Sequence, residues 1–139
     1  MTACFGGKDF NFVLEWGGGV NYRVDTSNGT LGTKESFEIE WQTIDFVIPD
    51  KMMQSIHDKF AGHNIDGLPD DVSEEDLTRR GHARYFFTYG ARTIFCQEVN
   101  RKDSASEEHK RFLIFVDFIA EYIYATEEFE NLVNIHRGE

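Results

Sequence analysis

A strict two-residue alternation near the start of the chain constrains the fold more than any other feature. Apolar residues fill every second position of one segment: Phe10, Phe12, Leu14 and Trp16. This period is typical of a strand that buries one face. Three glycines at 17–19 follow, and residues 20–26 have the composition of a second strand. The pattern predicts a β-hairpin, because a phosphate-binding glycine loop would be followed by a helix.

A third strand is expected after the next turn. Asn28-Gly29 indicates a type I′ turn, in which both central residues need a positive φ. Phe37, Ile39 and Trp41 then occupy alternate positions, with Glu38, Glu40 and Gln42 between them. We therefore expect the three apolar side chains to face the core together and the polar ones to face water.

A second hairpin is predicted around Gly90-Ala91, where glycine in the first central position suits a type II′ turn. The register set by this turn pairs three sets of residues: Phe87 with Ile94, Phe86 with Phe95, and Tyr85 with Cys96. Both faces of this hairpin are rich in apolar groups.

One helix is expected between the two hairpins. Pro49 suits its first turn, and Gly62 suits its end. Apolar residues recur at helical spacing between them: Met52, Met53, Ile56 and Phe60. A methionine stripe at this spacing favours a core position over a ligand surface. The polar segment that follows carries Ser73 and Asp76 at the spacing of a helix-start cap, so a short turn of helix is expected there.

The last part of the chain predicts a longer helix. Ser104 and Glu107 have capping-box spacing, and the apolar positions that follow are Phe112, Phe115, Ile119 and Ile123, with Leu113, Val116 and Ala120 beside them. Thr126 before two glutamates indicates a bend or a new helix start, with Phe129, Leu132 and Val133 on a final amphipathic segment.

These elements predict a single domain over residues 1–139, a length that can bury an independent core. The order strand, strand, strand, helix, strand, strand, helix (βββαββα) favours an α+β fold of two layers. We expect a mostly antiparallel sheet of about five strands with the two main helices on one face. A closed or strongly curled sheet is the alternative.

The net charge of −11 excludes whole classes of partner. Duplex nucleic acid and anionic membranes both repel such a chain, because their binding depends on lysine and arginine. Cys4 and Cys96 form neither a CxxC pair nor a disulfide framework, which suits a reducing compartment. Neither a leader-like start nor an apolar run of membrane-spanning length is apparent, so a cytoplasmic location is expected.

No catalytic or metal-binding motif accompanies the charge. The motif HExxH, paired CxxC motifs and a calcium-loop pattern are all missing from the sequence, so we expect no catalytic residue, no metal and no cofactor. The alternative is a small hydrolase or ligand-binding domain whose site lies near His57, His63 and Asp66. These residues come close together in sequence near the expected end of the first helix.

The acidity itself is the strongest functional indication. In the polar segment, Glu75 with Arg79 and Asp76 with Arg80 have helical ion-pair spacing. Four other acids have no basic residue at that spacing: Asp66, Asp70, Asp71 and Glu74. Such a cluster is either a solvated loop or a docking surface. We interpret it as a binding surface for a basic protein partner, with Tyr85, Phe87 and Tyr89 as aromatic anchors.

The sharpest form of this prediction is an inhibitor role. A small acidic protein without a catalytic site can neutralise a basic nuclease or other toxin by covering its active site. In this general character, and without any shared motif, the chain resembles the immunity proteins of bacterial toxin systems.

Overall fold

The computed structural model describes residues 3–5, 8–17, 20–35, 37–71, 83–98 and 107–137. The strands in these ranges are β1 (Ala3–Phe5), β2 (Lys8–Gly17), β3 (Val20–Asp25), β4 (Thr30–Glu35), β5 (Gln42–Asp45), β6 (Ala83–Tyr89) and β7 (Arg92–Glu98). The helices are α1 (Asp50–Gly62), α2 (Glu107–Tyr124) and α3 (Glu127–Arg137), with a short 3₁₀ turn, η1 (Ile65–Gly67).

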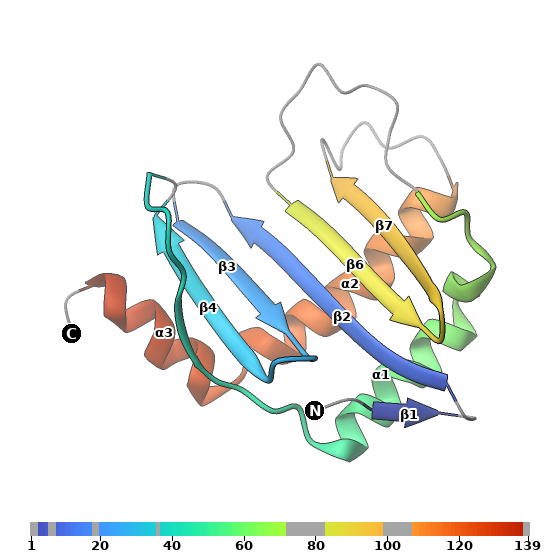
Figure 1. The fold of residues 1–139 in the computed structure, drawn as a ribbon, viewed down its shortest axis with the longest axis horizontal. Helices are drawn as coiled ribbons and strands as arrows, with labels where there is room; N and C mark the ends of the chain where they lie inside the picture. Colours follow the sequence, from blue (N-terminus) through green and yellow to red (C-terminus); the bar gives the residue numbers. More distant parts are fainter. Residues whose placement is uncertain are drawn as a thin grey trace.

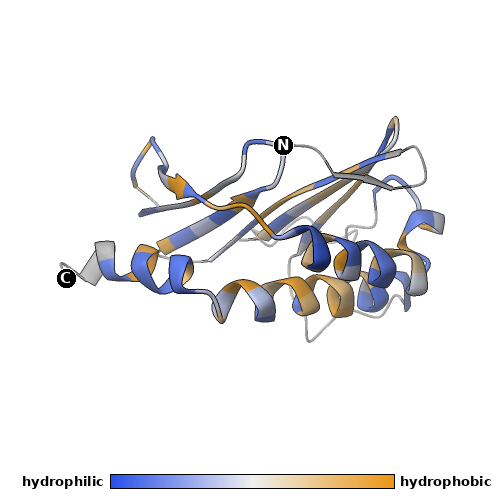
Figure 2. Ribbon diagram, turned by 90° about the horizontal axis from the view of Figure 1, so that it is seen from below, coloured by the Kyte–Doolittle hydropathy of each residue, from blue (hydrophilic) through white to orange (hydrophobic). Residues whose placement is uncertain are grey.

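The strands form one sheet in the order β5-β4-β3-β2-β6-β7, with β1 paired to the start of β2. Neighbouring strands pair antiparallel throughout the described ranges. The three helices lie on one face of the sheet, and none of the described helices covers the opposite face (Figure 1 and Figure 2). The predicted α+β class with an antiparallel sheet is confirmed, whereas the predicted five strands and two helices were too few.

The alternation in β2 has the predicted consequence. Phe10, Phe12 and Leu14 are buried on the helix-covered face. Trp16 is half-buried on the same face, with its ring 5.9 Å from Tyr22. The register predicted for the second hairpin, β6 with β7, is also confirmed.

The predicted third strand was wrong in its placement. The strand is β4, where Leu31 and Thr33 are buried, and it ends at Glu35. Beyond it the chain turns, because the backbone N–H of Glu38 donates to the carbonyl oxygen of Glu35 at 3.0 Å. Phe37 and Ile39 are consequently 85% and 93% exposed instead of facing the core.

The turn at Asn28-Gly29 also differs from the type I′ turn that its sequence predicts. Because Asp25 pairs with Thr30, the loop spans residues 26–29, and within it only Gly29 has a positive φ, of 64°. The Asp25 carboxylate accepts hydrogen bonds from the backbone N–H of Asn28 at 3.2 Å and from its side-chain amide at 2.7 Å. These local bonds favour a longer loop in which Asn28 keeps a negative φ.

Helix α1 begins after Pro49, whose carbonyl oxygen accepts from the N–H groups of Met52 and Met53. Its buried residues are Met53, Ile56 and Phe60, so the methionine stripe contributes to the core as predicted, with Met52 partly buried. The helix ends at Gly62, as predicted. The caps proposed at Ser73 and Ser104 lie outside the described residues.

The carboxyl-terminal helices complete the core. The predicted apolar positions of α2 are fully buried: Phe112, Phe115, Ile119 and Ile123. The chain restarts at Thr126 as predicted, because its side-chain oxygen accepts from the Phe129 backbone N–H at 3.2 Å and caps α3. On the inner side of α3, the Leu132 side chain is fully buried.

Two adjacent residues of α2 provide a test of this packing. We expect Phe115→Ala to lower the free energy of unfolding by roughly 3–5 kcal/mol, because the ring is fully buried. The neighbouring Ile114→Ala should change it by no more than about 0.5 kcal/mol, because Ile114 is 58% exposed. Denaturant unfolding of both variants measures the difference, and equal values would contradict the assigned helix face.

Candidate docking surface

The segment after α1 is joined to the outer edge of β7. The backbone N–H of Phe95 donates to the carbonyl oxygen of Asp70 at 2.7 Å. Asp71 forms an isolated parallel bridge with the same residue. Residues 70 and 71 therefore extend the sheet locally beyond its last strand, and their exposed side chains lie beside β7.

Arg92, the first residue of β7, holds this segment in place. Its Nε donates to the Asp70 carboxylate at 2.8 Å, and its terminal nitrogens donate to the carbonyl oxygens of Asp66 and Leu68. Asp70 thus has a basic partner, and its expected lack of one is corrected. The sequence did not indicate this pair, because Arg92 lies 22 residues further along the chain and only the sheet brings it to Asp70.

The aromatic anchors expected for this surface lie elsewhere. Tyr85 and Phe87 are 3% and 0% exposed on the helix-covered face, so neither can contact a partner. Tyr89 is half-buried, with its ring against Phe10 and Phe60. That part of the prediction is corrected, because Phe87 pairs directly with Phe12 of β2 and so shares its buried face.

The open face of the same hairpin carries a different aromatic pair. Phe86 and Phe95 are half-buried, and their ring centroids are 4.8 Å apart. Phe86 also lies directly opposite Val13 of β2 on this face. The predicted register had already paired Phe86 with Phe95, but apolar residues on both sides of the hairpin concealed which pair would be accessible.

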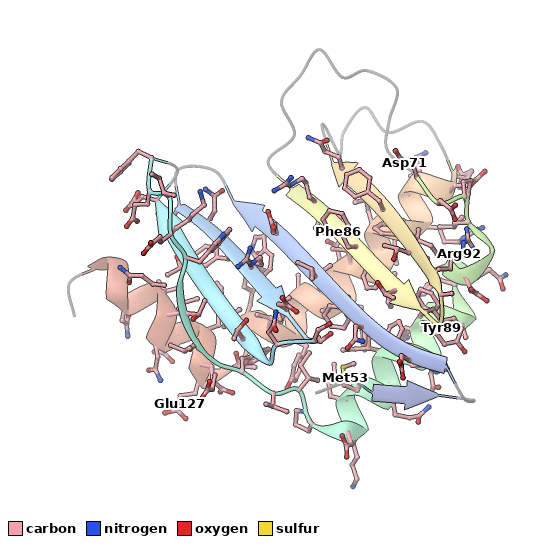
Figure 3. The ribbon with its side chains drawn as sticks, viewed as in Figure 1. Met53, Asp71, Phe86, Tyr89, Arg92 and Glu127 are labelled. Carbon is pink, nitrogen blue, oxygen red and sulfur yellow. The ribbon has the colours of Figure 1, made fainter. Side chains whose placement is uncertain are left out.

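We define the β7 edge surface by the residues that these contacts bring together: Asp66, Asp70, Asp71, Phe86 and Phe95. The first three are exposed acids of the segment that lies along the β7 edge, with Asp70 held by Arg92, and the last two form the half-buried aromatic pair on the open face. Figure 3 shows Phe86 on the open face of the sheet, with Asp71 and Arg92 to the side of β7. Glu74, also expected in this surface, lies outside the described residues.

Beside the aromatic pair, an ionic network crosses the open face. Glu15 of β2 accepts from Arg84 of β6 at 2.9 Å and lies 3.8 Å from Arg23 of β3. The Glu15 carboxylate therefore partly offsets both arginine charges. The positive potential of Arg84 and Arg23 on the open face is therefore reduced.

The histidines of the alternative site are not gathered around a common point. His57 packs against Phe10, and its Nε2 lies 3.4 Å from the Tyr89 hydroxyl oxygen. His63 follows the last turn of α1, and Asp66 is exposed on η1. Among the residues that the structure describes, no three His, Cys, Asp or Glu side chains are placed to hold a metal ion, these three included.

Tyr122, which lies on α2 outside the β7 edge surface, has a shifted pKa. Burial, and then the charge of Glu128 on α3, raises the pKa of its hydroxyl above the ordinary value. Both causes disfavour the phenolate form. The raised pKa thus follows from the packing of α2 near α3.

Comparison with known proteins gives no family. No protein-family model matches the chain, and no curated protein matches it. What the protein binds is therefore inferred from its own surface chemistry. Within the described ranges, no helix is long and apolar enough to cross a bilayer.

Replacing Arg92 tests how this surface is held. Arg92→Gln removes the charged fork that binds Asp70 and two backbone carbonyls, so the bond between the Phe95 amide and Asp70 should open more often. We expect hydrogen exchange of the Phe95 amide to accelerate about tenfold or more. The matched control is Arg84→Gln, which breaks an exposed pair with Glu15 and should leave that amide unchanged. Equal exchange in both variants would show that Arg92 does not hold the segment.

Proposed function

We propose that this protein is a non-catalytic acidic binding protein that docks a basic protein partner on its β7 edge surface. In its sharpest form the proposal is an immunity or inhibitor protein that covers the active site of a basic toxin or nuclease. One observation carries it: an acidic segment runs along the edge of β7 beside Phe95, whose ring pairs with Phe86 on the sheet face that the helices leave uncovered.

Charge supports the choice of partner. A chain with net charge −11 attracts cationic proteins over distances of about 8–10 Å at moderate salt, and repels anionic ones. Asp66 and Asp71 add exposed carboxylates at one edge of the sheet, whereas the Arg92 guanidinium offsets the charge of Asp70. Such a cluster increases the rate at which a basic partner arrives in the correct orientation.

The aromatic pair supplies what charge alone does not. Rim charges mainly set association rates, whereas buried aromatic side chains supply most of the binding free energy in known interfaces. Phe86 and Phe95 already pack against each other, so little conformational entropy is lost when a partner covers them. The two groups therefore have separable roles, steering for the acids and anchoring for the rings.

The Arg92 contacts support a preformed surface. They hold the backbone of residues 66–70 against β7 before any partner arrives. A surface that is already ordered loses less entropy on binding than a loop that must fold onto its partner. For an inhibitor that must act as soon as a toxin appears, this preorganisation favours fast and tight binding.

The steering role can be tested by changing two carboxylates. Asp66→Asn with Asp71→Asn should slow association with a basic partner captured from source-cell extract by about tenfold at low salt. Stability should change little, because both side chains are exposed and Arg92 binds the carbonyl of Asp66. Stopped-flow association at several salt concentrations measures the effect.

The control for this experiment changes the same amount of charge elsewhere. Glu121 and Glu130 are exposed on the helix layer, and Glu121→Gln with Glu130→Gln also raises the net charge by two. We expect this variant to associate at nearly the wild-type rate. Equal slowing by both pairs would assign the effect to net charge and would count against the β7 edge surface.

The anchoring role predicts an effect on dissociation. Phe86→Ala with Phe95→Ala should accelerate dissociation of the same partner about tenfold or more, because it removes the aromatic contact area. The association rate should change little, since the carboxylates remain. The exposed apolar residue Ile114 on α2 provides the control, and Ile114→Ala should dissociate like the wild type. Surface plasmon resonance separates the two rates, and an unchanged dissociation rate would remove the aromatic pair from the interface.

A further inference from the structure

A second feature of the open side of the molecule is the loop between β4 and β5. Phe37 is 85% exposed and Ile39 is 93% exposed, more than any other large apolar side chain that the structure describes. The exposed parts of these two side chains keep apolar surface in water, which costs about 25 cal/mol per Å². An isolated exposed apolar residue needs no explanation, but these two are exposed on the same loop, one residue apart.

Three hydrogen bonds link residues 34 and 35 to Glu38 in this loop. The backbone N–H of Glu38 donates to the Glu35 carbonyl at 3.0 Å, and the Glu38 carboxylate accepts from the Glu35 N–H at 2.7 Å. The Lys34 ammonium donates to the Glu38 carbonyl at 3.1 Å. Glu38 thus fixes the turn through both its backbone and its side chain, which presents Phe37 and Ile39 outward.

Trp41 anchors the other end of the loop to the open face. Its ring lies 4.6 Å from the Arg23 guanidinium and 5.5 Å from the Lys34 ammonium. A Cβ atom at Gly32 would come within 3.4 Å of the Trp41 ring and 3.2 Å of the Thr43 side chain. Glycine at position 32 therefore leaves room for the indole to lie on the sheet.

We propose that Phe37 and Ile39 form an apolar anchor that inserts into an apolar cleft of a partner protein whose rim carries lysine or arginine. Glu38 lies between the two apolar residues in the sequence and Glu40 follows them, and both glutamates supply the complementary charge for such a rim. The ordered turn at Glu38 presents the anchor without a folding step. This inference rests on the proposed function only in taking the partner to be basic.

Charge decides between this occupant and two others. A second copy of the chain would bring together two molecules of net charge −11, which repel each other. An anionic membrane would repel the same loop, because Glu38 and Glu40 alternate with its apolar residues. A basic-rimmed protein cleft accommodates both the apolar pair and its acidic neighbours.

The loop and the β7 edge surface lie at opposite edges of the sheet. The loop joins β4 to the edge strand β5, whereas β7 forms the other edge. Figure 1 shows β4 and β7 far apart across the sheet. Each surface can therefore be altered without touching the other.

Three synthetic helical peptides probe the loop directly. The first has a leucine and phenylalanine face rimmed by lysine and arginine, the second has the same face rimmed by glutamate, and the third keeps the basic rim but replaces the apolar face with serine and glutamine. We expect only the first to shift the amide signals of residues 37–41 in nuclear magnetic resonance spectra. Equal shifts from the third peptide would show attraction by charge alone and would overturn the anchor.

Variants of the loop give the quantitative test. Phe37→Ala with Ile39→Ala should weaken binding of the first peptide about tenfold or more without changing the thermal midpoint, because both side chains are exposed. The control is Val47→Ala, at a 56% exposed valine beyond β5, which should bind like the wild type. Unchanged binding by the double variant would overturn the proposal.

Two further measurements test the rejected occupants. In sedimentation, the wild type and the double variant should both be free of a dimer formed through the loop. In the second measurement, vesicles of neutral phosphatidylcholine should not bind the loop. Either positive result would overturn the assignment to a basic protein partner.

The Asp66→Asn, Asp71→Asn variant should bind the first peptide normally at the loop. If it does so while binding of the captured partner is unaffected by those changes, the loop proposal stands and the β7 edge surface fails.

Discussion

The structure depends on a layer of phenylalanine rings between the sheet and the helices. The Phe87 ring lies 5.5 Å from Phe12 of β2, 4.9 Å from Phe115 of α2 and 6.2 Å from Phe60 of α1. Each ring that leaves water contributes about 1.5–3 kcal/mol, and close aromatic pairs add to this. Because Phe87 contacts the neighbouring strand and both helices, it couples the central strands to α1 and α2.

This layer also determines which surface is accessible. With Phe87 turned toward the helices, strand alternation turns Phe86 and its partner Phe95 to the open face. The backbone N–H of Phe95 in turn donates to the Asp70 carbonyl oxygen and so binds the acidic segment. The β7 edge surface is therefore a direct consequence of core packing on the opposite side of the same hairpin.

The proposed binding role combines features from distant parts of the sequence. Net charge attracts a basic partner, but Arg92 and the edge of β7 decide where the carboxylates of residues 66–71 are presented. Glu38 and Trp41 similarly decide how Phe37 and Ile39 are displayed at the other edge of the sheet. In both places an ionic or cation–π contact holds a segment next to apolar side chains, which would limit the entropy that the proposed binding costs.

Local pattern was sufficient for the elements whose partners are near in sequence. The alternation in β2 and the helical spacing of the last helices each repeat within a few residues. The turn at Gly90-Ala91 likewise depends on only two residues. The α+β class follows from their order. The Thr126 restart was also readable, because a capping oxygen acts on a backbone N–H only three residues away.

Tertiary structure decided what local pattern leaves ambiguous. Phe37 and Ile39 have the same alternation as a buried strand, but the bonds between Glu35 and Glu38 turn the chain away from the core. Tyr85 and Phe87 were as plausible as surface anchors as Phe86 and Phe95, because the hairpin is apolar on both faces. Sheet pairing with β2 resolved that choice, and the long-range pair of Arg92 with Asp70 arose only once the strands had assembled. A period shows that two faces differ, but only the rest of the fold shows which one is covered.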